Sequence, residues 1–170
     1  YIATATSGTQ MIYGHVKGYP ANSLWGYQFA GVWHNKEEIE ENKYTKQYIS
    51  VTQLEGYAKY ADINHDGILD SNDWIYLGSP EPVLSGGLMN SFKIYGVNVS
   101  IYCTYSLGGK IYNLSETILG SSNASSNYYR YMLDSWHPVR NPQSDIPSAR
   151  SHDSSYSSRY VHDASFFRIQ

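Results

Sequence analysis

Apolar and polar residues alternate with a period of two along much of this chain. The clearest case is residues 97–106, where Val, Ile, Cys and Tyr share one face and Asn, Ser, Thr and Tyr102 share the other. Successive side chains of a β-strand point to opposite faces, so this pattern predicts a strand of about ten residues. Residues 88–95 alternate in the same way and meet that strand at Gly96, which predicts a hairpin with a very short turn around residues 95–97.

Two further segments carry the strand pattern. In residues 25–34 the aromatic residues Trp25, Tyr27, Phe29 and Trp33 lie on one face with Gly31. A row of aromatic side chains on one face of a barrel strand is expected to meet lipid. Residues 165–170 predict the start of another strand. A helix of one or two turns is expected only in residues 35–42, where Asn35 provides an N-cap.

Residues 113–163 are rich in Ser, Asn, Tyr, Pro and His and show no convincing periodicity. A structureless connection of this length is uncommon in a compact soluble domain. It is ordinary in an outer-membrane barrel, which has short turns on one side and long loops on the other. The chain is therefore expected to be all-β, with antiparallel strands forming part of a transmembrane β-barrel that has long extracellular loops.

Composition narrows the classes of partner. The chain has 18 Tyr, 4 Trp and 4 Phe, with 12 basic and 15 acidic residues. Tyrosine at this density suits surfaces that are apolar on one side and wet on the other, such as sugar-binding clefts, protein interfaces and the aromatic girdles of outer-membrane barrels. No stretch concentrates Lys or Arg as phosphate binding requires, so nucleic acid is not an expected partner.

The 170 residues are expected to be one partial domain cut from a larger protein, since they start at Tyr1 and show neither a signal peptide nor an apolar run of about 18 residues. Acidic pairs such as Asp145 with Asp153 lack the accompanying pocket residues of a glycosidase. The histidines at 137, 152 and 162 are interpreted as polar loop residues. We therefore expect a protein that is not an enzyme.

The strongest local motif is the loop of residues 62–73. Alternate residues of such a loop point inward and supply the six to eight oxygen atoms that a hard cation prefers, while Gly67 at the sixth position permits the sharp turn. The spacing predicts a calcium site with these ligands: Asp62, Asn64, Asp66, Ile68 through its backbone carbonyl, Asp70 and Asp73. The alternatives are magnesium in the same loop, or an Asx-rich surface turn that binds no metal.

The residues flanking this loop do not form amphipathic helices. Residues 56–60 lack the helical pattern, and Gly78 and Pro80 follow within a few residues of Asp73. We therefore expect a loop between extended segments rather than a helix-loop-helix sensor. Asp at the twelfth position reaches less far than Glu, which favours a modest affinity for the ion. Its expected role is to stiffen an extracellular loop.

Short motifs follow one another in a defined order along the chain: GYP at 18–20, WGYQFAGV at 25–32, YADINHDG at 60–67, GSPEP at 78–82, GGLMNSF at 86–92, SLGGKIYN at 106–113, WHP at 136–138, DIP at 145–147 and DASFFRI at 163–169. This order resembles the C-terminal barrel region of SusC/RagA-type TonB-dependent transporters. His65 stands where that family usually has glycine.

The resemblance implies a large plugged barrel in the outer membrane of a Gram-negative, Bacteroidetes-like bacterium. Such a transporter imports oligosaccharides or peptides with energy from the TonB complex, sits in outer-membrane lipid and is capped by a SusD-like surface lipoprotein. Aromatic residues of the long loop are expected either to contact sugar or the lipoprotein, or to pack the loop on itself: Tyr128, Tyr129, Tyr131, Trp136 and Tyr156. The rival interpretation is a soluble, secreted, calcium-stabilised β module that binds carbohydrate.

Overall fold

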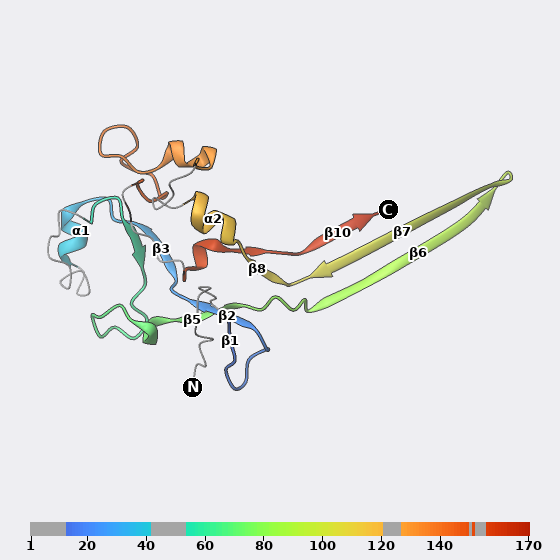
Figure 1. Cartoon of the computed structure of the whole chain (residues 1–170), viewed down its shortest axis with the longest axis horizontal. Coiled ribbons are helices and arrows are strands. Elements are labelled where there is room, and N and C mark those ends of the chain that lie inside the picture. Colours follow the sequence, from blue (N-terminus) through green and yellow to red (C-terminus); the bar gives the residue numbers. More distant parts are fainter. Residues whose placement is uncertain (1–12, 42–53, 121–126, 150, 152–155) are drawn as a thin grey trace.

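The computed structural model describes residues 13–41, 54–120, 127–149, 151 and 156–170. A long hairpin extends away from a region of short strands and helices, and the last strand runs beside one arm of the hairpin (Figure 1). We call the three paired strands the hairpin sheet, and the described parts of residues 13–83 and 108–165 the loop region. All pairings between named strands are antiparallel, which confirms the all-β expectation.

The hairpin consists of β6 (Leu84–Ile94) and β7 (Val97–Leu107), paired in continuous register from Leu84 opposite Leu107 to Ile94 opposite Val97. Its turn consists of Tyr95 and Gly96, whose φ angles of 46° and 85° are both positive. Two central residues with positive φ define a type I′ turn, whose twist matches that of the flanking strands. The predicted hairpin and its short turn are confirmed.

The third strand of the hairpin sheet is β10 (Phe166–Ile169), which pairs with β7 from Phe166 opposite Ser106 to Ile169 opposite Cys103. The strand order is therefore β10-β7-β6, and residues 108–165 connect β7 to β10. The predicted final strand is confirmed. The strands of the sheet are thus joined by a two-residue turn at one end and by a very long connection at the other.

The loop region contains three small antiparallel sheets. One sheet has the order β1-β2-β5, and the other two each contain two strands, β3-β4 and β8-β9. The strands are β1 (Tyr13–Gly14), β2 (Ser23–Gly26), β3 (Phe29–Val32), β4 (Ala58–Tyr60), β5 (Ile75–Gly78), β8 (Lys110–Tyr112) and β9 (Val161–Asp163).

The prediction of one continuous strand over residues 25–34 with a lipid-facing aromatic surface is wrong. The segment is divided between β2 and β3, and Trp25 and Trp33 are only 8% and 2% exposed. The physical reason is a close approach at Gly26, where a Cβ atom would lie 2.6 Å from the Tyr156 carbonyl oxygen. The Tyr27 N–H donates to that same oxygen, at 2.8 Å.

The hydrophobic core of the loop region lies around α1 (Lys36–Glu41). Trp33, Ile39 and Leu54 are buried together, and Tyr57 and Leu69 pack against them. The Glu38 N–H donates to Asn35 Oδ1 at 2.9 Å, so the predicted helix and its cap are confirmed. Glu38 also pairs with Lys59. Burial opposes its ionisation, but hydrogen bonds from Lys59 and the His34 N–H lower its pKa below the ordinary value.

Residues 113–163 contain more regular structure than the sequence predicts. They include α2 (Leu114–Leu119), the 3₁₀ turns η4 (Arg130–Asp134) and η5 (Ser158–Tyr160), and β9, which pairs with β8. Each element is too short to leave a periodic signature, and Asn113 caps α2 by a local hydrogen bond. No helix in the described residues is long and apolar enough to cross a membrane.

Candidate functional site

The hairpin sheet has one apolar and one largely polar face, and all eleven residues of β6 are exposed. The register places Leu88 opposite Cys103 and Phe92 opposite Val99 on the apolar face. On the other face, the hydroxyl oxygens of Ser91 and Ser100 lie 3.0 Å apart in a hydrogen bond. An exposed apolar surface of this kind marks a face that another phase or protein covers.

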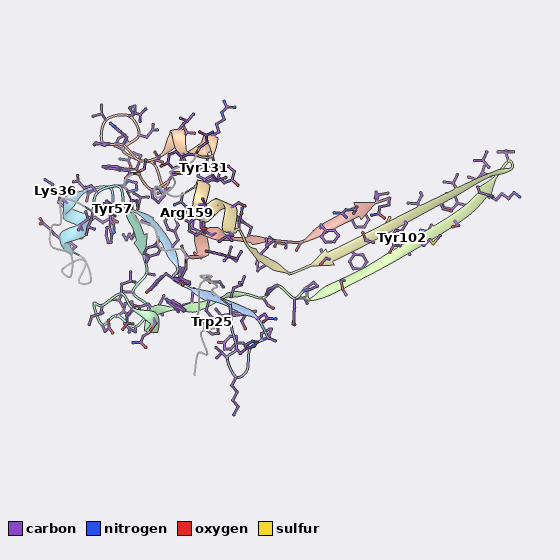
Figure 2. All side chains as sticks on the ribbon, in the orientation of Figure 1. Trp25, Lys36, Tyr57, Tyr102, Tyr131 and Arg159 are labelled. Carbon is purple, nitrogen blue, oxygen red and sulfur yellow. The ribbon has the colours of Figure 1, made fainter. Side chains whose placement is uncertain are left out.

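The length of these strands fits a membrane. Each arm of the hairpin has 11 residues, and a tilted β-strand needs about 9–11 residues to cross the hydrocarbon core. Figure 2 shows Tyr102 on the extended hairpin, while Trp25, Tyr57, Tyr131 and Arg159 lie in the crowded loop region. The sheet therefore has the dimensions and the two-faced pattern of a barrel wall.

The loop of residues 62–73 connects β4 to β5, as expected of a loop between extended segments. Asp62 accepts two backbone hydrogen bonds, from the His65 N–H at 2.7 Å and the Gly67 N–H at 2.9 Å. Asp66 Oδ1 accepts from the Ile68 N–H at 2.7 Å. Gly67 has a φ of 82°, so the sharp turn occurs where the spacing predicts it.

Asp73 is the most deeply buried carboxylate of the loop, with 0% of its surface exposed. Its Oδ1 accepts hydrogen bonds from the N–H groups of Ile63 and Asn64, at 2.9 and 3.3 Å. Its Oδ2 accepts from the Asp70 N–H at 3.0 Å, while Asp70 in turn caps η3 (Ser71–Asp73) by accepting from the Asn72 N–H. Asp73 thereby ties the beginning of the loop to its end.

The chemistry of the predicted ligand set fits a hard cation, but the described side chains do not surround one point. Within the described ranges, no group of three or more His, Cys, Asp or Glu residues converges as a metal site. The four loop carboxylates accept backbone N–H groups instead. None of the ion pairs between described residues joins a basic side chain to them. Calcium binding stays a prediction.

The histidines and acidic residues of the long loop make local structural contacts. His137 Nδ1 accepts from the Val139 and Arg140 N–H groups. His162 Nε2 lies 2.5 Å from Glu116 Oε2. Tyr131 also contacts Glu116, and its burial together with the negative charge of Glu116 raises the pKa of Tyr131 to about 12. His152 and Asp153 lie outside the described residues. Among those described, these contacts support the interpretation of His137 as a polar loop residue, whereas His162 lies in β9 and contacts Glu116 of α2.

The loop aromatics divide into two groups. Trp136 is buried and its indole N–H donates to the Pro142 carbonyl at 3.1 Å, while Tyr156 stacks on Trp74. Tyr131 stacks on Tyr129 with ring centroids 5.7 Å apart. The contacts of Trp136 and the Tyr129–Tyr131 pair pack the loop on itself, whereas Tyr156 packs it against Trp74, just before β5. Tyr128 and Tyr129 keep exposed surface that a ligand or another protein can contact.

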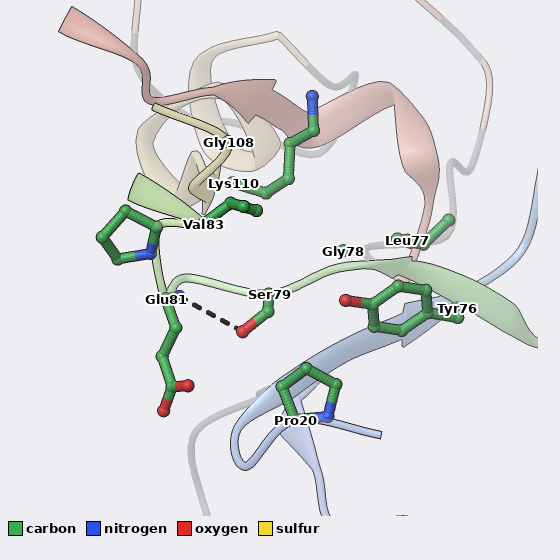
Figure 3. Close-up of a pocket in the computed structure, with 10 residues that line it drawn as sticks. Pro20, Tyr76, Leu77, Gly78, Ser79, Glu81, Val83, Gly108 and Lys110 are labelled. Atoms are coloured by element: carbon green, nitrogen blue, oxygen red, sulfur yellow. Dashed lines mark hydrogen bonds between the residues drawn. The ribbon is translucent and has the colours of Figure 1, made fainter. Parts of the chain in front are cut away.

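The loop region also contains a pocket that local sequence patterns do not predict. A pocket of about 490 Å³ opens at the base of the hairpin, between the β1–β2 connection, β5 and the β7–β8 connection (Figure 3). Its residues come from three distant parts of the chain, which strand pairing brings together. Three motifs contribute residues to its wall, GYP at 18–20, GSPEP at 78–82 and SLGGKIYN at 106–113, but nothing local in them indicates that they meet.

Comparisons with known proteins agree with this geometry. No protein-family model matches the chain. TonB-dependent receptor P26 of Formosa agariphila is 32% identical over 148 residues, covering 85% of this chain and 14% of the receptor. TonB-dependent receptor P3 of the same organism is 27% identical over 154 residues, covering 91% of this chain and 15% of that receptor. The chain thus spans about a seventh of these relatives.

A solved structure described as the RagAB peptide transporter has the same fold over this segment. The superposition covers 94% of this chain and 16% of the transporter chain, with a TM-score of 0.69 and 16% sequence identity. These relatives are named as receptors and a transporter rather than as enzymes. The receptor sequences show that the chain belongs to the TonB-dependent receptors, and over this segment it shares the fold of the RagAB transporter structure.

Proposed function

We propose that this chain is part of an outer-membrane transporter that imports oligosaccharide or peptide nutrients with energy from the TonB complex in a Bacteroidetes-like bacterium. The observation that carries the proposal is the hairpin sheet, whose apolar face is exposed along eleven-residue strands. The loop region then lies outside the cell and the Tyr95–Gly96 turn lies on the periplasmic side, because barrels of this class have long extracellular loops and short periplasmic turns.

The two faces of β7 provide the test. Ile101 lies on the apolar face near the middle of the strand, and the neighbouring Ser100 lies on the polar face. In the full-length receptor, Ile101→Arg is expected to cost about 2–4 kcal/mol of folding free energy in lipid vesicles, because Arg then meets the bilayer midplane. Ser100→Arg is the matched control. Equal losses for the two variants would refute the assignment of the lipid face.

A soluble carbohydrate-binding module is not favoured by any described contact. Such a module would leave Leu88, Phe92 and Ile94 exposed to water on one continuous strand. Burial in lipid removes that cost, because apolar surface is stabilised by leaving water. The exposed strand face therefore supports the transporter over the soluble module.

We also propose that calcium orders the loop of residues 62–73 on the extracellular side. Four carboxylates and the Asn64 amide lie in one turn, and the described ion pairs give the carboxylates no basic partner. A cation would offset the mutual repulsion of these groups. Binding would require the Asp62, Asp66 and Asp70 side chains to rotate toward a shared ion, whereas Asp73 is already held in place by three N–H groups.

The metal proposal is tested by thermal unfolding of the receptor after chelation, with calcium added back in steps. A ligand that binds only the folded state stabilises it by about 2.7 kcal/mol at one hundred times its dissociation constant. Asp66→Ala is expected to abolish the calcium-dependent shift, whereas Ser71→Ala, at a position that supplies no ligand, should retain it. If the unfolding temperature of the unmodified receptor does not change when calcium is added, this proposal is wrong.

The extracellular partner that we propose is a SusD-like lipoprotein seated on the outer part of the long loop. Leu133 and Val139 are 73% and 83% exposed there, and Tyr128 is also exposed. Aromatic and aliphatic side chains of this kind are typical anchors of protein interfaces. Leu133→Asp is expected to weaken co-purification of the lipoprotein with the receptor, while Leu114→Asp, an exposed position on α2, serves as the control. Equal co-purification with both variants would exclude this surface.

A further inference from the structure

The pocket at the base of the hairpin has the size and lining of a small-ligand site. Its volume of about 490 Å³ lies within the range of about 300–1,000 Å³ that is usual for such sites. Pro20, Tyr76 and Val83 supply apolar walls, and Ser79 and Glu81 supply polar groups. Since the long loops of the barrel lie outside the cell, this pocket opens at the extracellular mouth of the proposed transporter.

An aromatic cluster borders the pocket. The ring centroids of Tyr19 and Tyr76 lie 5.0 Å apart, and Trp25 meets Tyr19 edge-on at 4.9 Å. Tyr19 and Tyr76 are exposed while Trp25 is 8% exposed. The buried indole N–H of Trp25 has no acceptor among the described residues. Trp25 therefore holds two tyrosine rings in place, and both rings keep open surface beside the pocket.

The polar groups gather on one side of the segment that links β5 to β6. Figure 3 shows the Tyr76 hydroxyl directed toward Ser79, with the Glu81 side chain on the same side as Pro20. Ser79 Oγ accepts a hydrogen bond from the Glu81 N–H at 3.2 Å, which fixes the turn of this segment. The ion pairs between described residues leave Glu81 without a basic partner, so its carboxylate can accept hydrogen bonds from a ligand.

Among the described residues that line the pocket, Lys110 is the only one with a positive charge, and that charge is already compensated. Lys110 Nζ lies 3.3 Å from Asp163. Hydrogen bonds from Ser165 and Lys110 hold the pKa of Asp163 at about 2, so this carboxylate stays ionised beside Lys110. The pocket therefore offers aromatic surface, hydroxyl groups and a carboxylate, with no excess positive charge. An anionic ligand would be repelled by Glu81, whereas a neutral ligand with many hydroxyl groups matches both surfaces.

We propose that this pocket binds a sugar unit of a neutral oligosaccharide at the mouth of the transporter. The apolar face of the sugar ring lies against Tyr76 and Tyr19, and its hydroxyl groups donate to Glu81 and exchange hydrogen bonds with Ser79 and Tyr76. Rings with an apolar face and a polar rim are the ligands that exposed tyrosines hold well. This inference rests on the proposed transport function and assigns it a substrate class and a first contact.

The test uses the full-length receptor, purified in detergent and titrated calorimetrically with maltohexaose, cellohexaose, mannohexaose and xylohexaose, and with hexaglycine as the peptide probe. At least one of the four sugars is expected to bind. Tyr76→Ala and Glu81→Ala should each weaken that affinity by at least about tenfold, because each removes a principal contact. Tyr95→Ala, which alters the exposed tyrosine at the far turn, should leave the affinity unchanged.

Two further variants separate binding from folding. Tyr76→Phe keeps the ring and the contacts with Tyr19 and Trp25, so it should retain most of the affinity. Glu81 is exposed, so its replacement should leave the unfolding temperature unchanged. The proposal is overturned if no sugar binds, or if sugar binding survives both Tyr76→Ala and Glu81→Ala. It is also overturned if hexaglycine binds and loses affinity in these two variants as expected for the sugar.

Failure of this inference is distinguishable from failure of the transport function. A receptor in which Ile101→Arg is far more damaging than Ser100→Arg keeps its barrel assignment even when no hexaose binds. Conversely, equal losses of folding free energy in those two variants would refute the membrane assignment, whether or not a sugar binds. The two experiments use different residues on different regions of the chain.

Discussion

The hairpin sheet and the loop region place their apolar side chains in opposite ways. Every residue of β6 is exposed, whereas the buried hydrophobic residues described in the chain all belong to the loop region. The loop region buries Trp33, Ile39 and Leu54 against one another, as a region that folds in water does. The hairpin sheet leaves most of its apolar face exposed within the described chain, as the proposed insertion into lipid requires. Under that proposal, similar residues acquire different roles from the solvent that surrounds them.

The largest expected effect comes from replacing the same residue type in the two regions. Ile39 is 0% exposed in the core of the loop region and Ile94 is 53% exposed on the hairpin. Ile39→Ala is expected to destabilise the loop region by about 2–5 kcal/mol, because it leaves a cavity in a packed core. Ile94→Ala leaves no internal cavity and should cost much less. Hydrogen exchange of the receptor in vesicles measures the stability lost in each variant. Similar losses of stability for Ile39→Ala and Ile94→Ala would contradict the difference between the two regions.

An intermediate effect is expected at Asp73. Asp73→Ala removes the acceptor for the Ile63, Asn64 and Asp70 N–H groups, and an unsatisfied buried donor costs about 1–3 kcal/mol. We expect faster proteolysis within residues 62–73 and unchanged insertion of the hairpin. Asp66→Ala is the control in the absence of calcium, because Asp66 is exposed. Identical proteolysis of the two variants would show that Asp73 does not tie the loop together.

The smallest effect concerns pH. Glu38 has a pKa below its ordinary value of 4.5 because of Lys59 and the His34 N–H, which outweigh the opposing effect of burial. A carboxyl group with a lowered folded-state pKa stabilises the fold above its unfolded-state pKa, and this contribution is lost as pH falls through the folded-state value. The attachment of α1 should therefore weaken below about pH 4.5. Glu38→Gln should remove that pH dependence and Glu37→Gln should keep it, as followed by proteolysis near α1.

The hairpin was predictable from sequence because alternation and a short turn are local properties. Residues 88–106 carry both signals, so strand pairing, register and turn follow from neighbouring residues. The same alternation gave a wrong prediction at residues 25–34. The backbone of Tyr156, which is distant in sequence, contacts this segment and divides it into two strands. Period-two alternation reports which side chains share a face, but it does not report what covers that face.

The loop of residues 62–73 was only partly predictable. Its boundaries and the turn at Gly67 follow from spacing, because glycine and Asx residues impose local backbone geometry. The burial of Asp73 depends on how the loop between β4 and β5 folds back on itself and was not visible in the motif. The pocket was not predicted for a similar reason. Pro20, Tyr76 and Lys110 line one pocket only because β2 pairs with β5 and β6 pairs with β7.

The most direct test of the membrane assignment is a nitroxide scan of residues 97–107 in a cysteine-free version of the full-length receptor in lipid vesicles. Oxygen dissolves in the hydrocarbon core, whereas a nickel chelate stays in water. We predict that oxygen collision rates rise at positions 97, 99, 101, 103 and 105, with low values at the positions between them, because β7 alternates between lipid and the interior. Rates without a period of two, or high nickel accessibility on the apolar face, would contradict the account.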